Sequence, residues 1–169
     1  TAHFKGNSVE IWASTQAQSW NQHWVSKLTG LPPKAITIHT TYLGGGFGRL
    51  LESDYDVEAV DVSRAAGNVP VKVVWTREDD IQFTKTRPLT VQRVEAGLDA
   101  QGNLVAFHHR IVAESIYARF APPAFEKAGG RDLPVCEGAF EPTYGYPNFL
   151  LEYLREQRGV DVAVWRGVG

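Results

Sequence analysis

Apolar positions near the start of the chain follow first a two-residue and then a four-residue spacing. Residues 8–14 (Ser-Val-Glu-Ile-Trp-Ala-Ser) carry β-branched and aromatic side chains, which predicts a strand. Trp20, Trp24 and Leu28 then recur at every fourth position, so the pattern predicts a helix with these residues on its apolar face. Isoleucine and threonine alternate in residues 35–40, where we expect a second strand.

A run of glycines separates this second strand from a longer helical pattern. Residues 52–66 place apolar side chains at helical spacing, which predicts an amphipathic helix. Its expected apolar face consists of Tyr55, Ala59, Val62 and Ala66. Residues 69–75 are rich in valine, which predicts a buried strand.

Two long alternating segments dominate the second half of the chain. Before them, residues 76–80 (Thr-Arg-Glu-Asp-Asp) predict a capped turn or short helix, because acidic residues are favourable at a helix N-terminus. Residues 90–98 and 104–115 alternate apolar and polar side chains. Residues 99–103 between them contain the Asp, Gly and Asn that are typical of hairpin turns. We therefore expect a β-hairpin.

The C-terminal part mixes an irregular stretch with two apolar segments. Residues 118–142 are rich in Pro, Gly and mixed charge, which predicts an irregular excursion. Residues 148–155 and 160–165 predict two further strands. Strands and helices do not alternate regularly, which favours an α+β fold with helices packed on a mixed β-sheet. The length suits one domain or a compact pair of subdomains, and we expect a single domain over residues 1–169.

The composition argues against several classes of function. A formal net charge of -2 without a basic block argues against nucleic acid as a partner. Cys136 is the only cysteine, so the chain offers neither an internal disulfide nor a cysteine cluster for zinc or iron–sulfur ligation. No apolar run is long enough to cross a bilayer. Because the sequence contains no methionine, we interpret it as a piece of a longer polypeptide.

The glycine run, residues 44–49 (Gly-Gly-Gly-Phe-Gly-Arg), is the first candidate for chemistry. Glycines leave the backbone bare, so the chain turns sharply and brings its N–H groups close to a ligand. A helix that follows such a loop adds unpaired donors and a partial positive charge. The pattern therefore suits an anionic group or an oxygen on a metal, although a tight turn without a ligand explains it equally well.

Five motifs in order carry a resemblance to a known family. They are Ser14-Thr15-Gln16, Leu43-Gly44-Gly45-Gly46-Phe47-Gly48-Arg49, Trp75-Thr76-Arg77-Glu78-Asp79-Asp80, Asp99 with Gly102, and Trp165-Arg166-Gly167-Val168-Gly169. Together they resemble the molybdenum-binding subunit of the xanthine oxidase family. The form of the motifs is most similar to the branch of isoquinoline 1-oxidoreductase beta subunits and membrane-associated aldehyde dehydrogenases.

This resemblance implies roles for particular residues. Gln16 matches the glutamine that hydrogen-bonds an oxo ligand of molybdenum, and an amide NH2 group is a suitable donor for such an oxygen. Gly46 and Phe47 match positions whose backbone lies against the metal's oxygen ligands, and Arg166 matches an arginine that borders the cofactor. The complete expected cofactor-binding set is Gln16, Gly45, Gly46, Phe47, Gly48, Arg49, Arg166 and Gly167.

Each of these residues also has a purely structural interpretation. Gln16 can cover the helix that it precedes, and Arg166 can be an ordinary surface arginine. His39, His108 and His109 lack metal-ligand spacing with any Cys or Glu motif, so we expect no metal ligand among them. The catalytic glutamate of the family has no match in this chain, so we expect no catalytic residue here and no activity from these residues alone.

The resemblance also implies a cofactor and partners. We expect molybdopterin with molybdenum, in its cytosine dinucleotide form, and [2Fe–2S] clusters on an iron–sulfur small subunit. The remainder of the same large subunit would be a further partner. The substrate would be an aldehyde or an N-heterocycle. Leu51 stands where purine-oxidising members carry a glutamate, which argues against a purine.

Two questions stay open at this point. Branch membership implies a periplasmic or membrane-associated enzyme, with a cytoplasmic one as the alternative. A non-catalytic assembly domain that retains the fold is a second functional hypothesis. A general phosphate or nucleotide binder is a third, but the loop lacks the Lys-Ser/Thr ending of a P-loop.

Overall fold

Alternating apolar residues build a small sheet at the start of the chain. The computed structural model describes residues 1–169, which divide into two units, residues 1–84 and 85–169. The first unit contains β1 (Ala2–Phe4), β2 (Val9–Ala13) and β3 (Ile36–Thr40). β2 lies in the middle, antiparallel to β1 and parallel to β3. The two strands predicted from residues 8–14 and 35–40 are thereby confirmed, whereas the short β1 has no counterpart in the sequence prediction.

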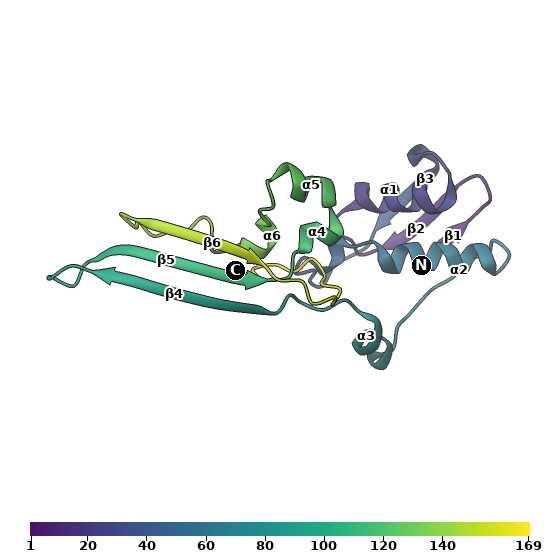
Figure 1. The fold of residues 1–169 in the computed structure, drawn as a ribbon. Coiled ribbons are helices and arrows are strands. Elements are labelled where there is room, and N and C mark those ends of the chain that lie inside the picture. The colour runs from purple at the N-terminus through teal and green to yellow at the C-terminus, as the bar shows by residue number, and fades with distance from the viewer. The chain divides into compact units, whose positions relative to one another are not determined.

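Two helices cover one face of this sheet. α1 (Gln18–Thr29) and α2 (Asp54–Ala65) contact each other and lie beside the strands in Figure 1. The core of the unit consists of Ala2, Val9, Ile11, Ala13, Val25, Ile36, Ala59 and Val60. Because side chains alternate along β2, Trp12 points to the opposite face, where it stacks on His39 of β3 at 4.9 Å between ring centroids.

Both helices exist as predicted, and their predicted faces are confirmed in part: Ala59 is buried, and Leu28 and Tyr55 pack against the core. The buried residues of α1 are Asn21 and Val25, while Trp20 is 40% exposed. Those of α2 are Asp56, Ala59, Val60 and Ser63, while Val62 is 42% exposed. Polar side chains thus occupy buried positions beside these apolar residues, where Asn21 hydrogen-bonds Asp56 and Ser63 hydrogen-bonds the Val69 carbonyl.

Residues 69–75 correct a second prediction. The segment forms no strand of the sheet. Val71 alone makes a bridge to Ala2, and Val69 and Val74 are 45% and 70% exposed. This valine-rich segment is thus an extended connection with largely exposed side chains rather than a buried strand. The rest of the unit comprises the short helices η1 (Pro33–Ala35), η2 (Arg49–Leu51) and α3 (Arg77–Phe83). The capped turn predicted at residues 76–80 is confirmed, since Thr76 and Asp79 form a reciprocal capping box at the start of α3.

A second three-stranded sheet organises residues 85–169. β4 (Thr90–Leu98) and β5 (Leu104–Ala113) form the predicted antiparallel hairpin, and β6 (Phe149–Arg155) pairs parallel to β5 (Figure 1). Asp99 closes the hairpin turn by accepting hydrogen bonds from the backbone N–H groups of Gln101 and Asn103. β5 ends two residues before the predicted boundary. Residues 160–165 form no strand, and Val162 contributes a single bridge to Thr86.

The segment expected to be irregular contains short helices. After α4 (Ile116–Phe120) come α5 (Pro122–Lys127) and α6 (Leu133–Cys136). Buried Asp132 organises them, because its carboxylate accepts hydrogen bonds from Ser115 and from the backbone of Tyr117 and Val135. Proline and charged residues therefore do not prevent helix formation here, because the buried Asp132 carboxylate stabilises these short helices in the absence of an apolar pattern.

The α+β class with helices on mixed sheets is confirmed by both units. The assignment of residues 1–169 to one cofactor-binding domain remains a prediction. The structure divides these residues into the two units described above. None of the helices combines the length and apolar character that a membrane crossing requires.

Candidate cofactor-binding site

The glycine loop leaves β3 and returns to α2 through backbone conformations that require glycine. Gly45 and Gly48 have φ angles of 142° and 84°. Phe47 also has a positive φ, 49°, and its side chain is 69% exposed. A Cβ atom at residue 46 would overlap the side-chain amide of Gln16, so the loop approaches Gln16 this closely only because residue 46 is glycine.

Gln16 is fixed against this loop at both of its ends. Its backbone N–H donates to the carbonyl of Leu50 at 3.0 Å. Its side-chain Oε1 accepts a hydrogen bond from the backbone N–H of Gly48 at 3.1 Å. Because that donor defines which side of the amide is oxygen, the NH2 group points away from Gly48, and it makes no hydrogen bond within the chain.

The loop that contacts this amide also offers backbone donors. The N–H groups of Gly44, Gly45, Gly46 and Phe47 make no hydrogen bond within the chain, whereas Gly48 donates to Gln16 and Arg49 to the Gly46 carbonyl. Gly44 and Gly45 are exposed. Backbone donors need no side-chain ordering to bind an acceptor. The donor set therefore fits a ligand rich in oxygen acceptors, and it meets the requirement of a molybdenum cofactor in that respect.

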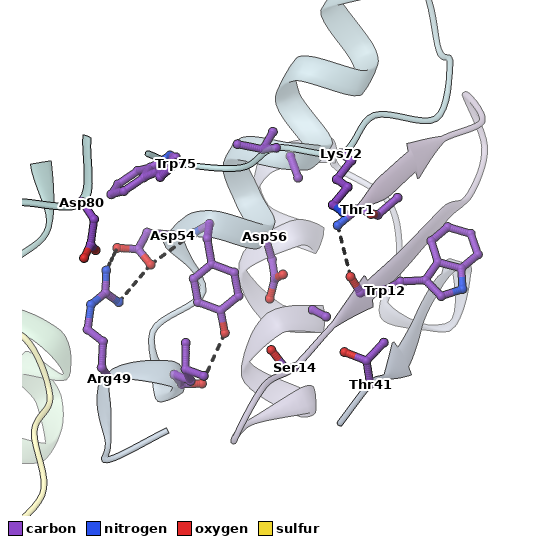
Figure 2. A pocket seen from close by; sticks show the side chains of 15 residues that line it. Thr1, Trp12, Ser14, Thr41, Arg49, Asp54, Asp56, Lys72, Trp75 and Asp80 are labelled. Atoms are coloured by element: carbon purple, nitrogen blue, oxygen red, sulfur yellow. Dashed lines mark hydrogen bonds and ion pairs between the residues drawn. The ribbon is translucent and has the colours of Figure 1, made fainter. Parts of the chain in front are cut away.

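Arg49, the last residue of the motif, turns away from these donors. Its guanidinium binds the carboxylate of Asp54 through two hydrogen bonds of 3.1 and 2.7 Å (Figure 2). Its Nε also donates to Thr84 at 3.3 Å. A bidentate pair of this kind neutralises the arginine and fixes its direction. The structure thus gives Arg49 a role in attaching the loop to α2, and its expected contact with the cofactor remains a prediction.

A cavity of about 580 Å³ in the first unit is lined in part by Thr41, Arg49 and Leu50, which flank the loop in the sequence. Figure 2 shows Trp12, Arg49, Asp54, Asp56 and Trp75 among the side chains that line it. The Asp56 side chain is almost completely buried, at 2% exposure. Burial is the main reason why the pKa of Asp56 rises to about 7; the charge of Asp54 acts in the same direction, and the N-terminal ammonium and Asn21 oppose it.

Asp56 belongs to a buried polar cluster that sequence reasoning missed. Asn21 donates a hydrogen bond to its carboxylate and accepts one from Ser53 at 2.6 Å and one from Thr15 at 3.3 Å. All four residues are at most 4% exposed. The sequence does contain one indication of this cluster, because Asn21 and Asp56 stand at helical spacing from apolar residues of their own helices.

Arg166 and Gly167, the remaining predicted residues, lie in the second unit. The Arg166 side chain is exposed, and Gly167 has a φ of 60°. Arg87 binds the carbonyl groups of both residues, and the N–H of Gly167 donates to the carboxylate of Glu137 at 3.1 Å. The loop is therefore attached to its own unit through its backbone, while the Arg166 guanidinium extends from it.

The three histidines considered in the sequence contact neighbouring side chains. His39 stacks on Trp12, His108 lies between the carboxylates of Glu95 and Glu152, and His109 hydrogen-bonds Gln92. No group of three or more His, Cys, Asp or Glu side chains is placed to hold a metal ion. The thiol of Cys136 is buried, and burial raises its pKa to about 11, so it stays protonated.

Comparison with known proteins gives consistent matches. The model of the molybdopterin cofactor-binding domain family matches residues 1–132. The isoquinoline 1-oxidoreductase beta subunit of Brevundimonas diminuta is 35% identical over 163 residues, which are 96% of this chain and 21% of that protein. A membrane-bound aldehyde dehydrogenase (pyrroloquinoline-quinone) of Gluconacetobacter polyoxogenes is 38% identical over 109 residues, 64% of this chain and 14% of that protein.

A solved structure agrees at the level of the fold. Quinoline 2-oxidoreductase of Pseudomonas putida 86 superposes with a TM-score of 0.62 at 20% identity, over 96% of this chain and 20% of that one. The chain thus spans about a fifth or less of the length of these relatives. The resemblance stated from the motifs is confirmed, and the chain belongs to the molybdopterin cofactor-binding domain family.

Proposed function

We propose that Gln16 and the glycine loop form one wall of a molybdopterin cofactor site in an oxidoreductase. This enzyme would hydroxylate an aldehyde or an electron-poor carbon of an N-heterocycle, with oxygen taken from water. Two observations carry the proposal. The Gln16 NH2 group has no partner in the chain, and the loop that Gln16 contacts at Gly46 and Gly48 has four consecutive backbone N–H groups, at residues 44–47, that also have none. The names of the two similar enzymes support the substrate classes.

The bound cofactor would supply a molybdenum ion that acts as Lewis acid and redox centre. The residues of this chain would bind and orient it. The Gln16 amide would donate to an oxygen on the metal, and its own oxygen stays on Gly48, so the donor is held in one direction. The loop N–H groups would donate to further oxygen atoms of the cofactor without any loss of side-chain entropy.

The catalytic base is expected elsewhere in the protein. The carboxylate of Asp54 is engaged by Arg49, and that of Asp56 is buried and hydrogen-bonded by Asn21. Neither is available to a substrate at the glycine loop. We therefore propose that residues 1–169 bind cofactor but do not turn over substrate alone.

Finer features of the assembly are part of the same proposal. The cofactor would be the cytosine dinucleotide form, and Arg166 would border it with its free guanidinium end. Electrons would leave through [2Fe–2S] clusters of an iron–sulfur partner subunit, since the only cysteine of this chain is a buried, protonated thiol. The similarity to a membrane-bound aldehyde dehydrogenase supports a periplasmic or membrane-associated location.

Elemental analysis of the natively expressed full-length protein tests the proposal. Near-stoichiometric molybdenum is expected after purification, together with a pterin released on denaturation. Absence of molybdenum, in a host that loads a control molybdenum enzyme, would contradict the proposal and favour a non-catalytic assembly domain. Turnover by the isolated residues 1–169 would contradict the proposed division between cofactor binding and catalysis.

A further inference from the structure

A connected group of buried polar side chains adjoins Gln16. We call Thr15, Asn21, Ser53 and Asp56 the Asn21 cluster. Their exposures are 4%, 0%, 4% and 2%, so water does not compete for their hydrogen bonds. They come from three places in the chain: the segment before α1, the first half of α1, and the start of α2. Such a group is costly to bury unless its members satisfy one another.

Asn21 is the centre of this cluster because it uses both halves of its amide. Its NH2 group donates to Asp56, and its oxygen accepts hydrogen bonds from the hydroxyl groups of Ser53 and Thr15. The carboxylate of Asp56 thereby decides which way the Asn21 amide is turned. Ser53 adds a second constraint at 2.6 Å.

The cluster reaches Gln16 through its immediate neighbours in the sequence. The Thr15 hydroxyl accepts from the backbone N–H of Ala17 at 3.1 Å, so the residues on both sides of Gln16 are attached to one oxygen atom. The Leu50 carbonyl is the acceptor for the backbone N–H of Gln16, and it lies 3.3 Å from the same Thr15 hydroxyl. Leu50 is in turn part of the chain that leaves the glycine loop.

A substitution of Asn21 would therefore change how Gln16 is held against the glycine loop. Without the Asn21 amide, the hydroxyl of Ser53 and the carboxylate of Asp56 lose their partner in a site that water reaches poorly. Those groups can regain partners only if α1 or α2 moves. Either movement shifts Thr15 and Leu50, which hold Gln16 between them.

We propose that the Asn21 cluster positions the Gln16 amide against the glycine loop and thereby controls how firmly the cofactor is retained. This inference rests on the proposed function, because it assigns the retained ligand to the same site. Asn21, Ser53 and Asp56 are positioning residues that act through Thr15 and Leu50. They touch neither cofactor nor substrate.

Two buried serines give a matched test. Ser53, which directly precedes α2, donates to Asn21, whereas Ser63, which is fully buried within α2, donates to the Val69 carbonyl and accepts from the Phe4 N–H. Ser53→Ala and Ser63→Ala each remove one buried hydroxyl, but only the first touches the Asn21 cluster. Asn21→Ala is the stronger variant, and Asp56→Asn is the conservative one that keeps an acceptor for the Asn21 NH2 group.

The first measurement is hydrogen exchange of the segment that contains Gly48, in the cofactor-free full-length protein. The second is the rate at which the holoprotein loses molybdenum during dialysis. In Ser53→Ala we expect both rates to rise by roughly tenfold, as is typical when a supporting hydrogen bond is removed. Asn21→Ala should raise them further, while Ser63→Ala should leave both near the wild-type rates. Asp56→Asn should leave them unchanged at about pH 5, where the buried Asp56 of the wild type also holds a proton.

The outcomes separate this inference from the proposed function. Equal effects of Ser53→Ala and Ser63→Ala on both rates would overturn the positioning role. Faster exchange without faster molybdenum loss would overturn the control of cofactor retention. A wild-type protein without molybdenum would overturn the proposed function and the retention claim, and the exchange of Gly48 would still decide whether the cluster positions Gln16.

Discussion

Each unit contains a connected group of polar side chains, and the two groups differ in how much water reaches them. In the first unit, the Asn21 cluster is at most 4% exposed. In the second, Arg93, Glu95, His108, Arg110 and Glu152 form a charge ladder across β4, β5 and β6. The side chains of Arg93, Arg110 and Glu152 are 69%, 43% and 36% exposed.

The comparison shows that hydrogen-bond length alone does not measure importance. The ladder contains short contacts, including 2.6 Å between His108 and Glu152 and 2.7 Å between Arg110 and Glu152. Water and salt weaken such exposed pairs, so they contribute little to stability. The same contacts in a buried cluster are strengthened by their surroundings and are costly to break. We therefore expect the first unit to be sensitive to polar substitutions and the second to tolerate them.

The largest expected effect is a pH dependence that Asp56→Asn removes. The pKa of Asp56 is about 7 in the folded protein, chiefly because of burial, against an ordinary value of 3.8. A carboxyl group that binds its proton more tightly when folded contributes stability below its unfolded pKa and loses it as the pH rises through the folded pKa. From about pH 4 to about pH 8, wild-type stability should therefore fall relative to Asp56→Asn, by up to roughly 4 kcal/mol.

Urea unfolding of both proteins at several pH values measures this difference. Because both proteins share every other titrating group, the difference isolates Asp56. A difference that stays constant over the range would contradict the assignment of a proton to Asp56.

Asn21→Ala is expected to have the next largest effect. The substitution leaves buried partners unsatisfied, so the free energy of unfolding should fall by about 3 kcal/mol. Gln18→Ala is the control on the same helix, because the Gln18 side chain makes one exposed hydrogen bond, to Thr40. That variant should stay within about 0.5 kcal/mol of the wild type. Similar losses in the two variants would show that burial does not distinguish them.

Gly46→Ala tests the close approach of the loop to Gln16. The added methyl group would overlap the Gln16 amide, so the loop or the side chain must move, at a cost of roughly 2 kcal/mol. Gly44→Ala is the matched control, since no atom lies within 4 Å of the Cβ position there. Thermal unfolding should be lowered in Gly46→Ala alone. An unchanged Gly46→Ala protein would contradict the contact.

Glu152→Gln in the charge ladder should have the smallest effect. The pKa of Glu152 is lowered chiefly by its hydrogen bond from Arg110 and further by its hydrogen bond with His108. The contribution of the Glu152 carboxylate to stability is therefore present at neutral pH and is lost as the pH falls through that pKa. The group is exposed, and the loss should shrink further at high salt. A denaturant midpoint that shifts as much as in Asn21→Ala would remove the contrast between the two groups.

The sequence predicted the elements better than the faces that they bury. Spacing located both long helices and the hairpin, because each has a repeated apolar pattern. It placed Trp20 and Val62 on buried faces, which are instead occupied by Asn21 and by Asp56 with Ser63. A pattern that equates burial with apolar character cannot find polar residues that satisfy one another across two helices.

The site was predictable as a set of residues but not as an arrangement. The motifs named Gln16 and the glycine loop, and the structure brings them into contact across a long stretch of chain. The pairing of Arg49 with Asp54 was accessible from their closeness in sequence and charge, yet the motif assigned Arg49 to the cofactor. The free N–H groups and the Asn21 cluster depend on tertiary packing, which spacing alone does not encode.

The most direct test of the central claim is the molybdenum content of the full-length Gln16→Ala protein, compared with wild type and Gln18→Ala. Gln16 offers the unpartnered amide beside the loop, whereas Gln18 lies nearby with its amide on Thr40. We predict that Gln16→Ala loses most of its molybdenum while Gln18→Ala retains the wild-type content. Full molybdenum retention by folded Gln16→Ala would contradict the claim that this amide and loop hold the cofactor.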